Sequence, residues 1–154
     1  MIRLLGVALV VAVIAPNAFA GEPMSRDAVI EAARTGIDFV DNTYVQQRKT
    51  ENLDLVLIDV RTQSEYELGH IPGAIWIPRG RAEFEVAEMV RDAETEIIVY
   101  CKTGSRAALV LKSLVAQGYQ NVTAHKGFKT WADAGLPLKN ELGVLQLIEE
   151  KAEE

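Results

Sequence analysis

The chain has 154 residues, of which 49% are hydrophobic, and its 22 acidic and 16 basic side chains give a net charge of −6 at pH 7. This acidic balance argues against nucleic-acid binding, which needs clustered positive charge. The single cysteine, Cys101, excludes an internal disulfide. The two histidines, His70 and His125, form no close pair with it, so we expect no metal site and no cofactor.

Residues 1–20 have the pattern of a cleaved signal peptide. Arg3 gives a positive start, residues 4–15 form an apolar run, and Ala18-Phe19-Ala20 matches the small-residue cleavage pattern. A membrane-spanning helix needs about 20 apolar residues, more than this run supplies, so we predict cleavage and no membrane attachment afterwards. Loss of Arg3 changes the net charge from −6 to −7. We therefore expect an exported protein, located in the periplasm.

Residues 21–154 are enough for one domain in which helices and strands alternate. In chain order we expect a helix at 26–40, a polar connector at 46–52, strands at 53–60 and 74–77, a helix at 82–91, a strand at 97–100, a helix at 106–117, a strand at 121–124, a short helix at 128–134 and an amphipathic helix at 142–154. The β-branched runs are typical of strands buried on both faces. The pattern predicts an α/β fold with a parallel sheet flanked by helices on both faces.

The same pattern gives the division of the chain. We assign 1–20 to the signal peptide, 21–52 to an N-terminal helix and connector, 53–140 to the main domain and 141–154 to a C-terminal amphipathic helix.

Cys101 lies where a buried strand passes into a helix, in the sequence Cys101-Lys102-Thr103-Gly104-Ser105-Arg106, called the Cys101 loop below. Ligands of an open parallel sheet bind at the carboxyl ends of its strands. Backbone N–H groups in such a loop can form an anion-binding nest. The helix dipole, Lys102 and Arg106 add positive charge, which favours the thiolate form of the cysteine.

Two further residues shape this loop. Gly104 permits a positive φ and a close approach of the backbone to a ligand. Ser105 is expected to cap the following helix, although its hydroxyl is also able to bind the anion. A free cysteine is most often a small buried hydrophobic residue. The polar sequence that follows Cys101 favours a reactive thiolate instead.

Several segments resemble motifs of the rhodanese family, in the family's order. They are Leu57 to Arg61 with Glu65-Tyr66 and Gly69 to Ala74, the stretch Tyr100 to Arg106, Gly118 to Val122, and Trp131 to Pro137. The resemblance covers about residues 55–137 and implies a rhodanese fold with the activity of a thiosulfate sulfurtransferase-like transferase. One departure is Lys126-Gly127-Phe128, where members commonly have a Gly-Gly pair.

The resemblance implies a double displacement. The Cys101 thiolate would take sulfur from a donor such as thiosulfate to form a persulfide, and cyanide, a small thiol or a protein thiol would then remove it. The resemblance implies that the rest of the loop binds the substrate, namely Lys102, Thr103, Gly104, Ser105 and Arg106. Of these, Lys102 or Arg106 would orient the sulfonate group of thiosulfate.

Asp59 and Arg61 match the family's Asp-x-Arg pattern and are expected to support the site. We expect Arg61 to pair with Asp59 or with a loop carbonyl rather than to bind substrate. His70 also matches the family, and we expect it to be a turn residue satisfied by hydrogen bonds.

Two alternatives remain open. A cysteine-dependent phosphatase or arsenate reductase also places a thiolate before a helix, but it has its arginine six positions after the cysteine. Here Arg106 is five positions after Cys101, and the tighter loop suits a single sulfur better than a phosphate. The second alternative is a rhodanese-like sulfur carrier or binding module without turnover.

Overall fold

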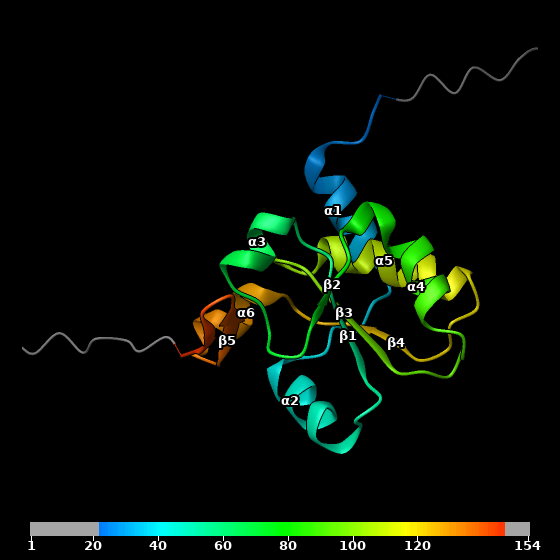
Figure 1. Cartoon of the computed structure of the whole chain (residues 1–154). Helices are drawn as coiled ribbons and strands as arrows, with labels where there is room; N and C mark the ends of the chain where they lie inside the picture. Colours follow the sequence, from blue (N-terminus) through cyan, green and yellow to red (C-terminus); the bar gives the residue numbers. More distant parts are fainter. Residues whose placement is uncertain (1–21, 147–154) are drawn as a thin grey trace, which may run out of the picture.

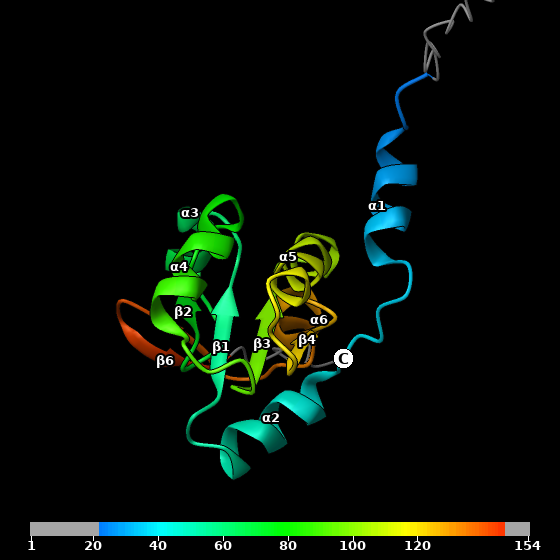
Figure 2. The same cartoon turned by 90° about the vertical axis from the view of Figure 1, so that its right-hand side faces the viewer.

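Four parallel strands form the centre of the molecule, seen here in a computed structural model that describes residues 22–146. The strands lie together at the centre of Figure 1, and Figure 2 shows their spatial order, which is β2 (Ile75–Trp76), β1 (Val56–Asp59), β3 (Ile97–Tyr100) and β4 (Val122–Ala124). The register places Asp59 opposite Tyr100, so the residues that follow β1 and β3 are neighbours at the carboxyl end of the sheet. The predicted parallel sheet is confirmed.

Helices cover both faces of this sheet (Figure 1, Figure 2). Successive residues of a strand point to opposite faces. Accordingly, Ile97 and Val99 pack with α4 (Ala82–Met89) and α5 (Ser105–Ala116), whereas Ile98 and Tyr100 pack with α2 (Asn42–Glu51) and α6 (Phe128–Asp133). Two shorter elements, α3 (Gln63–Leu68) and the 3₁₀ turn η1 (Arg79–Arg81), complete the connections on the β2 side.

The N-terminal helix is shorter than predicted. The helix α1 (Arg26–Arg34) packs against α5 and ends before Gly36, which has a φ of +76°. A positive φ is incompatible with a continuing α-helix, so the prediction of a helix to residue 40 is wrong. The chain then extends to Val40, which forms a parallel bridge with His125 beside β4.

Residues 46–52, predicted as a polar connector, instead belong largely to α2. Asp41 caps this helix by accepting a hydrogen bond from the Tyr44 N–H at 3.0 Å. Val45 is its one buried residue. A helix with so narrow an apolar contact gives no hydrophobic periodicity in the sequence.

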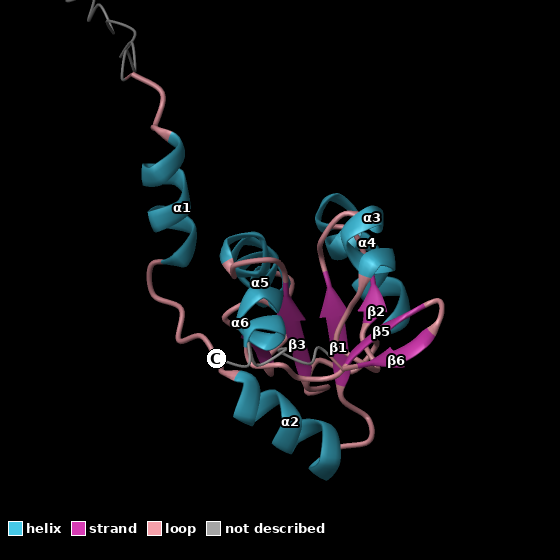
Figure 3. Ribbon diagram, turned by 90° about the vertical axis from the view of Figure 1, so that its left-hand side faces the viewer, coloured by secondary structure: helices cyan, strands magenta, loops and turns pink. Residues whose placement is uncertain are grey.

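The predicted helix from Leu142 is wrong for residues 143–145. These residues form β6 (Gly143–Leu145), which pairs antiparallel with β5 (Leu138–Asn140) (Figure 3). The turn between the strands is stabilised by the Asn140 side chain, whose Oδ1 accepts from the Leu142 N–H at 2.9 Å, and by Gly143 at a φ of +119°. The rest of the predicted helix, residues 147–154, lies outside the described residues.

Among residues 22–146, no helix has the length and apolar character needed to cross a membrane. The predicted signal peptide at 1–20 lies outside this range.

Candidate active site

The Cys101 loop connects β3 to α5, as the sequence predicted. Cys101 is 1% exposed and directly follows the buried strand. Gly104, with a φ of +92°, is the N-cap of α5, and Ser105 is its first helical residue. The expected capping by Ser105 is therefore wrong, because the helix begins one residue earlier than predicted and no side chain in the described part of the chain caps it.

Backbone carbonyl groups of this loop accept hydrogen bonds from residues outside the loop. Three of them accept hydrogen bonds from residues far away in the sequence: Cys101 from the Phe128 N–H at 2.7 Å, Lys102 from the Lys129 N–H at 3.0 Å, and Thr103 from Nη1 of Arg34 at 2.7 Å. The Gly104 carbonyl accepts from the Ala108 N–H within α5 at 2.8 Å. The orientation of each peptide plane is thereby set.

These contacts determine where the N–H groups of the loop point. In a trans peptide, the C=O of one residue and the N–H of the next lie on opposite sides, and the described residues contain no cis peptide bond. The N–H groups of Lys102, Thr103 and Gly104 therefore point away from their outer partners. Within residues 22–146, none of these three N–H groups donates to a protein acceptor. They are available to an anion at the start of a helix, where the dipole adds positive charge.

The segment after β4 presses directly on this loop. Gly127 has a φ of +121°, and a Cβ there would lie 2.6 Å from the Lys102 carbonyl oxygen and 2.7 Å from the Thr103 Cα. The site therefore needs a glycine at this position. The residue before it, Lys126, is exposed, and its N–H donates to the Val40 carbonyl at 3.0 Å.

His125 fixes Gly127 in place. Its Nδ1 accepts from the Gly127 N–H at 3.2 Å, and its Nε2 contacts Oδ1 of Asn42 at 2.8 Å. Burial lowers the pKa of His125 to about 4, so the ring is neutral at pH 7 and Nδ1 is free to accept. Sequence reasoning considered His125 only as a metal ligand and missed this role.

Asp59 and Arg61 form a buried ion pair beside the loop. Nη2 of Arg61 donates to Oδ2 of Asp59 at 2.6 Å and to the Gly69 carbonyl at 2.7 Å. The guanidinium lies 3.9 Å from the centre of the Phe128 ring. Arg61 thus makes both contacts expected from the sequence, one to Asp59 and one to a loop carbonyl. It also packs on Phe128, whose N–H donates to the Cys101 carbonyl.

Arg106 is paired with Glu65, a residue that sequence reasoning noted in a motif but not in the site. Nη1 of Arg106 donates to Oε2 at 2.9 Å and Nη2 donates to Oε1 at 3.0 Å. These bonds lower the pKa of Glu65 to about 2. Glu65 and, more weakly, the nearby Cys101 raise the pKa of Arg106. The guanidinium is therefore a permanent positive charge close to the sulfur.

His70 is a structural residue of its turn, as expected. It is buried, its Nδ1 lies 3.0 Å from the Tyr66 carbonyl oxygen, and its ring stacks on Tyr66 with 3.7 Å between ring centres.

An open cleft of about 490 Å³ begins at the loop. Lys102, which is exposed, lines it together with apolar side chains from α3, α6 and β5, namely Leu68, Phe128 and Leu138. None of the ion pairs among the described residues includes Lys102. Its charge is thus available to an anionic molecule that enters the cleft.

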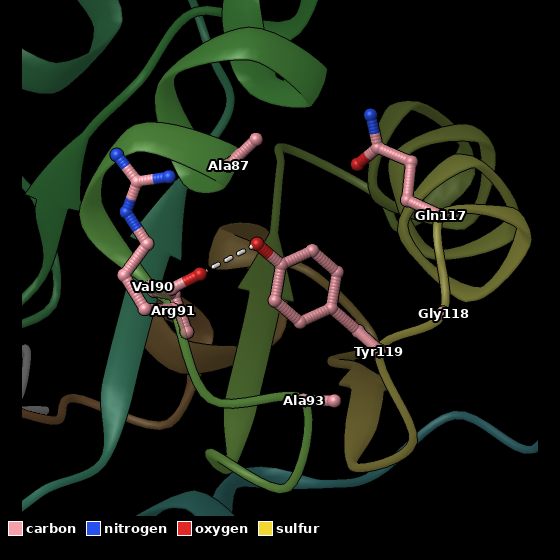
Figure 4. A pocket seen from close by; sticks show the side chains of 7 residues that line it. All are labelled: Ala87, Val90, Arg91, Ala93, Gln117, Gly118 and Tyr119. Carbon is pink, nitrogen blue, oxygen red and sulfur yellow. Dashed lines mark hydrogen bonds between the residues drawn. The ribbon is translucent and has the colours of Figure 1, made fainter.

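A second pocket shares no residue with this cleft or with the Cys101 loop. It lies between the ends of α4 and α5, where the Tyr119 hydroxyl donates to the Val90 carbonyl at 2.8 Å (Figure 4). This bond joins the two elements on one face of the sheet and has no contact with the Cys101 loop.

The fold places a buried cysteine between a strand and the start of a helix, next to three backbone N–H groups that have no protein acceptor among residues 22–146. A family model described as the rhodanese-like domain matches residues 41–134, and the chain belongs to the rhodanese family. The match includes α2 and excludes α1 and the β5–β6 hairpin.

Several of the known proteins that resemble the chain are named for sulfur transfer. A sulfurtransferase of Allochromatium vinosum is 30% identical over 103 residues, which cover 66% of this chain and 94% of that protein. The thiosulfate sulfurtransferase GlpE of Coxiella burnetii is 37% identical over 79 residues, 51% of this chain and 72% of its own. The homodimeric polysulfide-sulfur transferase of Wolinella succinogenes has a TM-score of 0.64 at 29% identity, with 75% of this chain and 87% of that chain covered. These relatives support a rhodanese-type sulfurtransferase.

Proposed function

We propose that the protein transfers sulfane sulfur from a donor such as thiosulfate to a nucleophilic acceptor through a persulfide on Cys101. The observation that carries this proposal is the set of N–H groups from Lys102 to Gly104, which have no protein acceptor among residues 22–146 and lie beside the single cysteine of the sequence. Such groups stabilise an anion in a fixed position without reorganisation.

The first step is attack of the Cys101 thiolate on the outer sulfur of thiosulfate. A bond forms between Sγ and this sulfur, the S–S bond of thiosulfate breaks, and sulfite leaves with the electron pair. The product is Cys–S–S⁻, whose terminal charge the loop N–H groups and Arg106 stabilise. Lys102 attracts the anionic donor from the cleft side.

The second step releases the sulfur. An acceptor nucleophile, either cyanide or a thiolate, attacks the outer sulfur of the persulfide, and the Cys101 thiolate leaves with the electrons of the broken S–S bond. The apolar wall formed by Leu68, Phe128 and Leu138 favours a thiol acceptor with an apolar body, including a thiol on a protein, because burial of that body releases water from both surfaces.

The loading reaction tests this proposal. After incubation with thiosulfate, we expect mass spectrometry of the intact protein to show an added mass of about 32 Da, the mass of one persulfide sulfur. The adduct must be absent from Cys101→Ser and must disappear when cyanide or a thiol is added. If the wild type gains no such mass, the proposal is wrong.

Turnover distinguishes an enzyme from a carrier. Repeated release of thiocyanate from thiosulfate and cyanide supports an enzyme, whereas a single loading without turnover identifies a carrier. Hydrolysis of an aryl phosphate that Cys101→Ser abolishes would favour a phosphatase instead.

We further propose that the protein is exported to the periplasm after cleavage of residues 1–20. The apolar run and the Ala18-Phe19-Ala20 pattern support this location. N-terminal sequencing of the mature protein from a periplasmic extract should give Gly21 as the first residue. Recovery of full-length protein from the cytoplasm alone would contradict it.

A further inference from the structure

Arg34 reaches the Cys101 loop from outside the family's domain. It is the last residue of α1, 69 positions before Thr103, and its Nη1 donates to the Thr103 carbonyl oxygen at 2.7 Å. The match to the family model begins at residue 41, so Arg34 lies outside it. Of the three loop carbonyls bound by distant residues, this is the one that receives a charged donor.

The guanidinium of Arg34 is confined by its neighbours. It lies 4.3 Å from the centre of the Phe39 ring. A Cβ on Gly104 would lie 2.9 Å from both Arg34 Nη1 and Phe39 Cε1, so these two side chains touch the backbone of the loop at its N-cap residue. A glycine at position 104 therefore permits the positive φ and also leaves room for the Arg34 side chain.

The helix that carries Arg34 is fastened to the same helix that starts at the loop. Nζ of Lys112, on α5, donates to the Ala32 carbonyl at 2.9 Å, and Ala33 is buried against the domain. Figure 1 shows α1 beside α5. These contacts give Arg34 a defined position relative to the start of α5.

We propose that Arg34 is a positioning residue for sulfur transfer, which orients the Thr103–Gly104 peptide so that the Gly104 N–H faces the Cys101 sulfur. This inference rests on the proposed function. The peptide is trans, so a donor fixed on the Thr103 carbonyl directs the Gly104 N–H to the opposite side. A positively charged donor also polarises the peptide and makes that N–H a stronger donor to an anion.

The role makes α1 part of the site. Phe128 and Lys129, which orient the first two peptides of the loop, lie within the residues matched to the family, whereas the third peptide depends on a helix outside the matched residues. Arg34 stabilises the thiolate and the persulfide through the loop without touching either sulfur.

Three variants of the full chain test this proposal. Arg34→Gln removes the charge, Arg34→Lys keeps the charge with a shorter donor, and Arg26→Gln is the matched control. Arg26 is also on α1 but is exposed, and among residues 22–146 its side chain forms one hydrogen bond, to its neighbour Asp27. The first readout is the rate of alkylation of Cys101 by iodoacetamide from about pH 6 to about pH 9, which reports the thiolate directly. The second is kcat and KM for thiosulfate.

We expect Arg34→Gln to alkylate about tenfold more slowly near neutral pH, with its rate profile moved to higher pH, and to lose about tenfold in kcat with a smaller change in KM. Arg34→Lys should recover part of both losses, and Arg26→Gln should behave as the wild type. Circular dichroism and thermal unfolding establish that each variant is folded.

An unchanged alkylation profile in folded Arg34→Gln would overturn the proposal, as would equal losses in Arg34→Lys and Arg34→Gln. Alkylation does not depend on sulfur transfer. If the wild type fails to load sulfur, the proposed function fails, while the alkylation comparison still decides whether Arg34 controls the cysteine.

Discussion

Glu65 and Arg106 bind each other through two parallel hydrogen bonds, at 2.9 and 3.0 Å, and so join α3 to the first turn of α5. Glu65 also accepts from the Thr62 N–H at 3.0 Å in the capping box of α3. The Glu65 carboxylate therefore caps α3 and also fixes the position of the Arg106 guanidinium at the start of α5.

This arrangement predicts that Glu65→Gln destabilises the protein by about 1–2 kcal/mol at pH 7, after allowance for partial solvent exposure. The folded pKa of about 2 lies below the ordinary value of 4.5, so the contribution is complete above pH 4.5 and is lost as the pH falls toward 2. Urea unfolding at several pH values measures the difference between the wild type and the variant. Glu67→Gln on the same helix is the control, and a difference that does not shrink in acid would contradict the prediction.

The buried His125 predicts a second loss of stability at a higher pH. Its pKa is about 4 in the folded protein and about 6.5 in the unfolded chain, so the unfolded state binds more protons between these values. Stability should be complete above pH 6.5 and fall by about 2–3 kcal/mol as the pH approaches 4. A protonated Nδ1 also ceases to accept from Gly127.

The measurement is an NMR titration of the His125 ring together with urea unfolding at several pH values. A titration midpoint near 6.5 would be incompatible with this prediction. In His125→Gln, the loss of stability between pH 6.5 and pH 4 should be much reduced.

Gly127→Ala should destabilise the protein by about 2–4 kcal/mol, because the new Cβ would meet the Lys102 carbonyl at 2.6 Å in addition to the strain of a positive φ. Gly143→Ala provides the control. Its φ of +119° is almost the same as that of Gly127, but a Cβ there would have no neighbour within 4 Å among residues 22–146. The control should therefore show only the backbone cost of about 1–2 kcal/mol. Equal losses of stability in chemical denaturation would disprove the close contact with the loop.

Lys102→Gln should raise KM for thiosulfate about three- to tenfold and leave kcat nearly unchanged, because an exposed charge on the cleft attracts the donor but does not touch the reacting bond. The effect should diminish at high salt. Steady-state kinetics at two ionic strengths measures both. Lys139 is an exposed lysine outside this cleft, so the control Lys139→Gln should change neither kcat nor KM. A fall in kcat for Lys102→Gln at constant KM would contradict the prediction and would assign Lys102 to the chemical step.

The parallel sheet and the Cys101 loop could be predicted from the sequence because their signals are local. The run Ile97–Tyr100 is apolar throughout, and the next residue begins a polar, glycine-containing loop. The order of strand, loop and helix can therefore be predicted from consecutive residues. The pairing of Arg61 with Asp59 was equally accessible, since the two residues are two positions apart.

Elements with weak patterns were predicted poorly. The helix α2 buries one residue, Val45, so its sequence has no apolar stripe from which a helix could be predicted. At residues 143–145, pairing with β5 decided the conformation, because a short segment takes the structure that its partner stabilises.

The sequence by itself determined that a single cysteine follows a buried strand and precedes a helix with positive charge nearby. Only the tertiary structure decided what surrounds that cysteine. Arg34, Phe128 and Glu65 come from separate elements, and their contacts with the loop span 27 to 69 positions along the chain. No local pattern records such contacts, because they exist only once the helices have packed on the sheet and brought distant residues to the same carboxyl end.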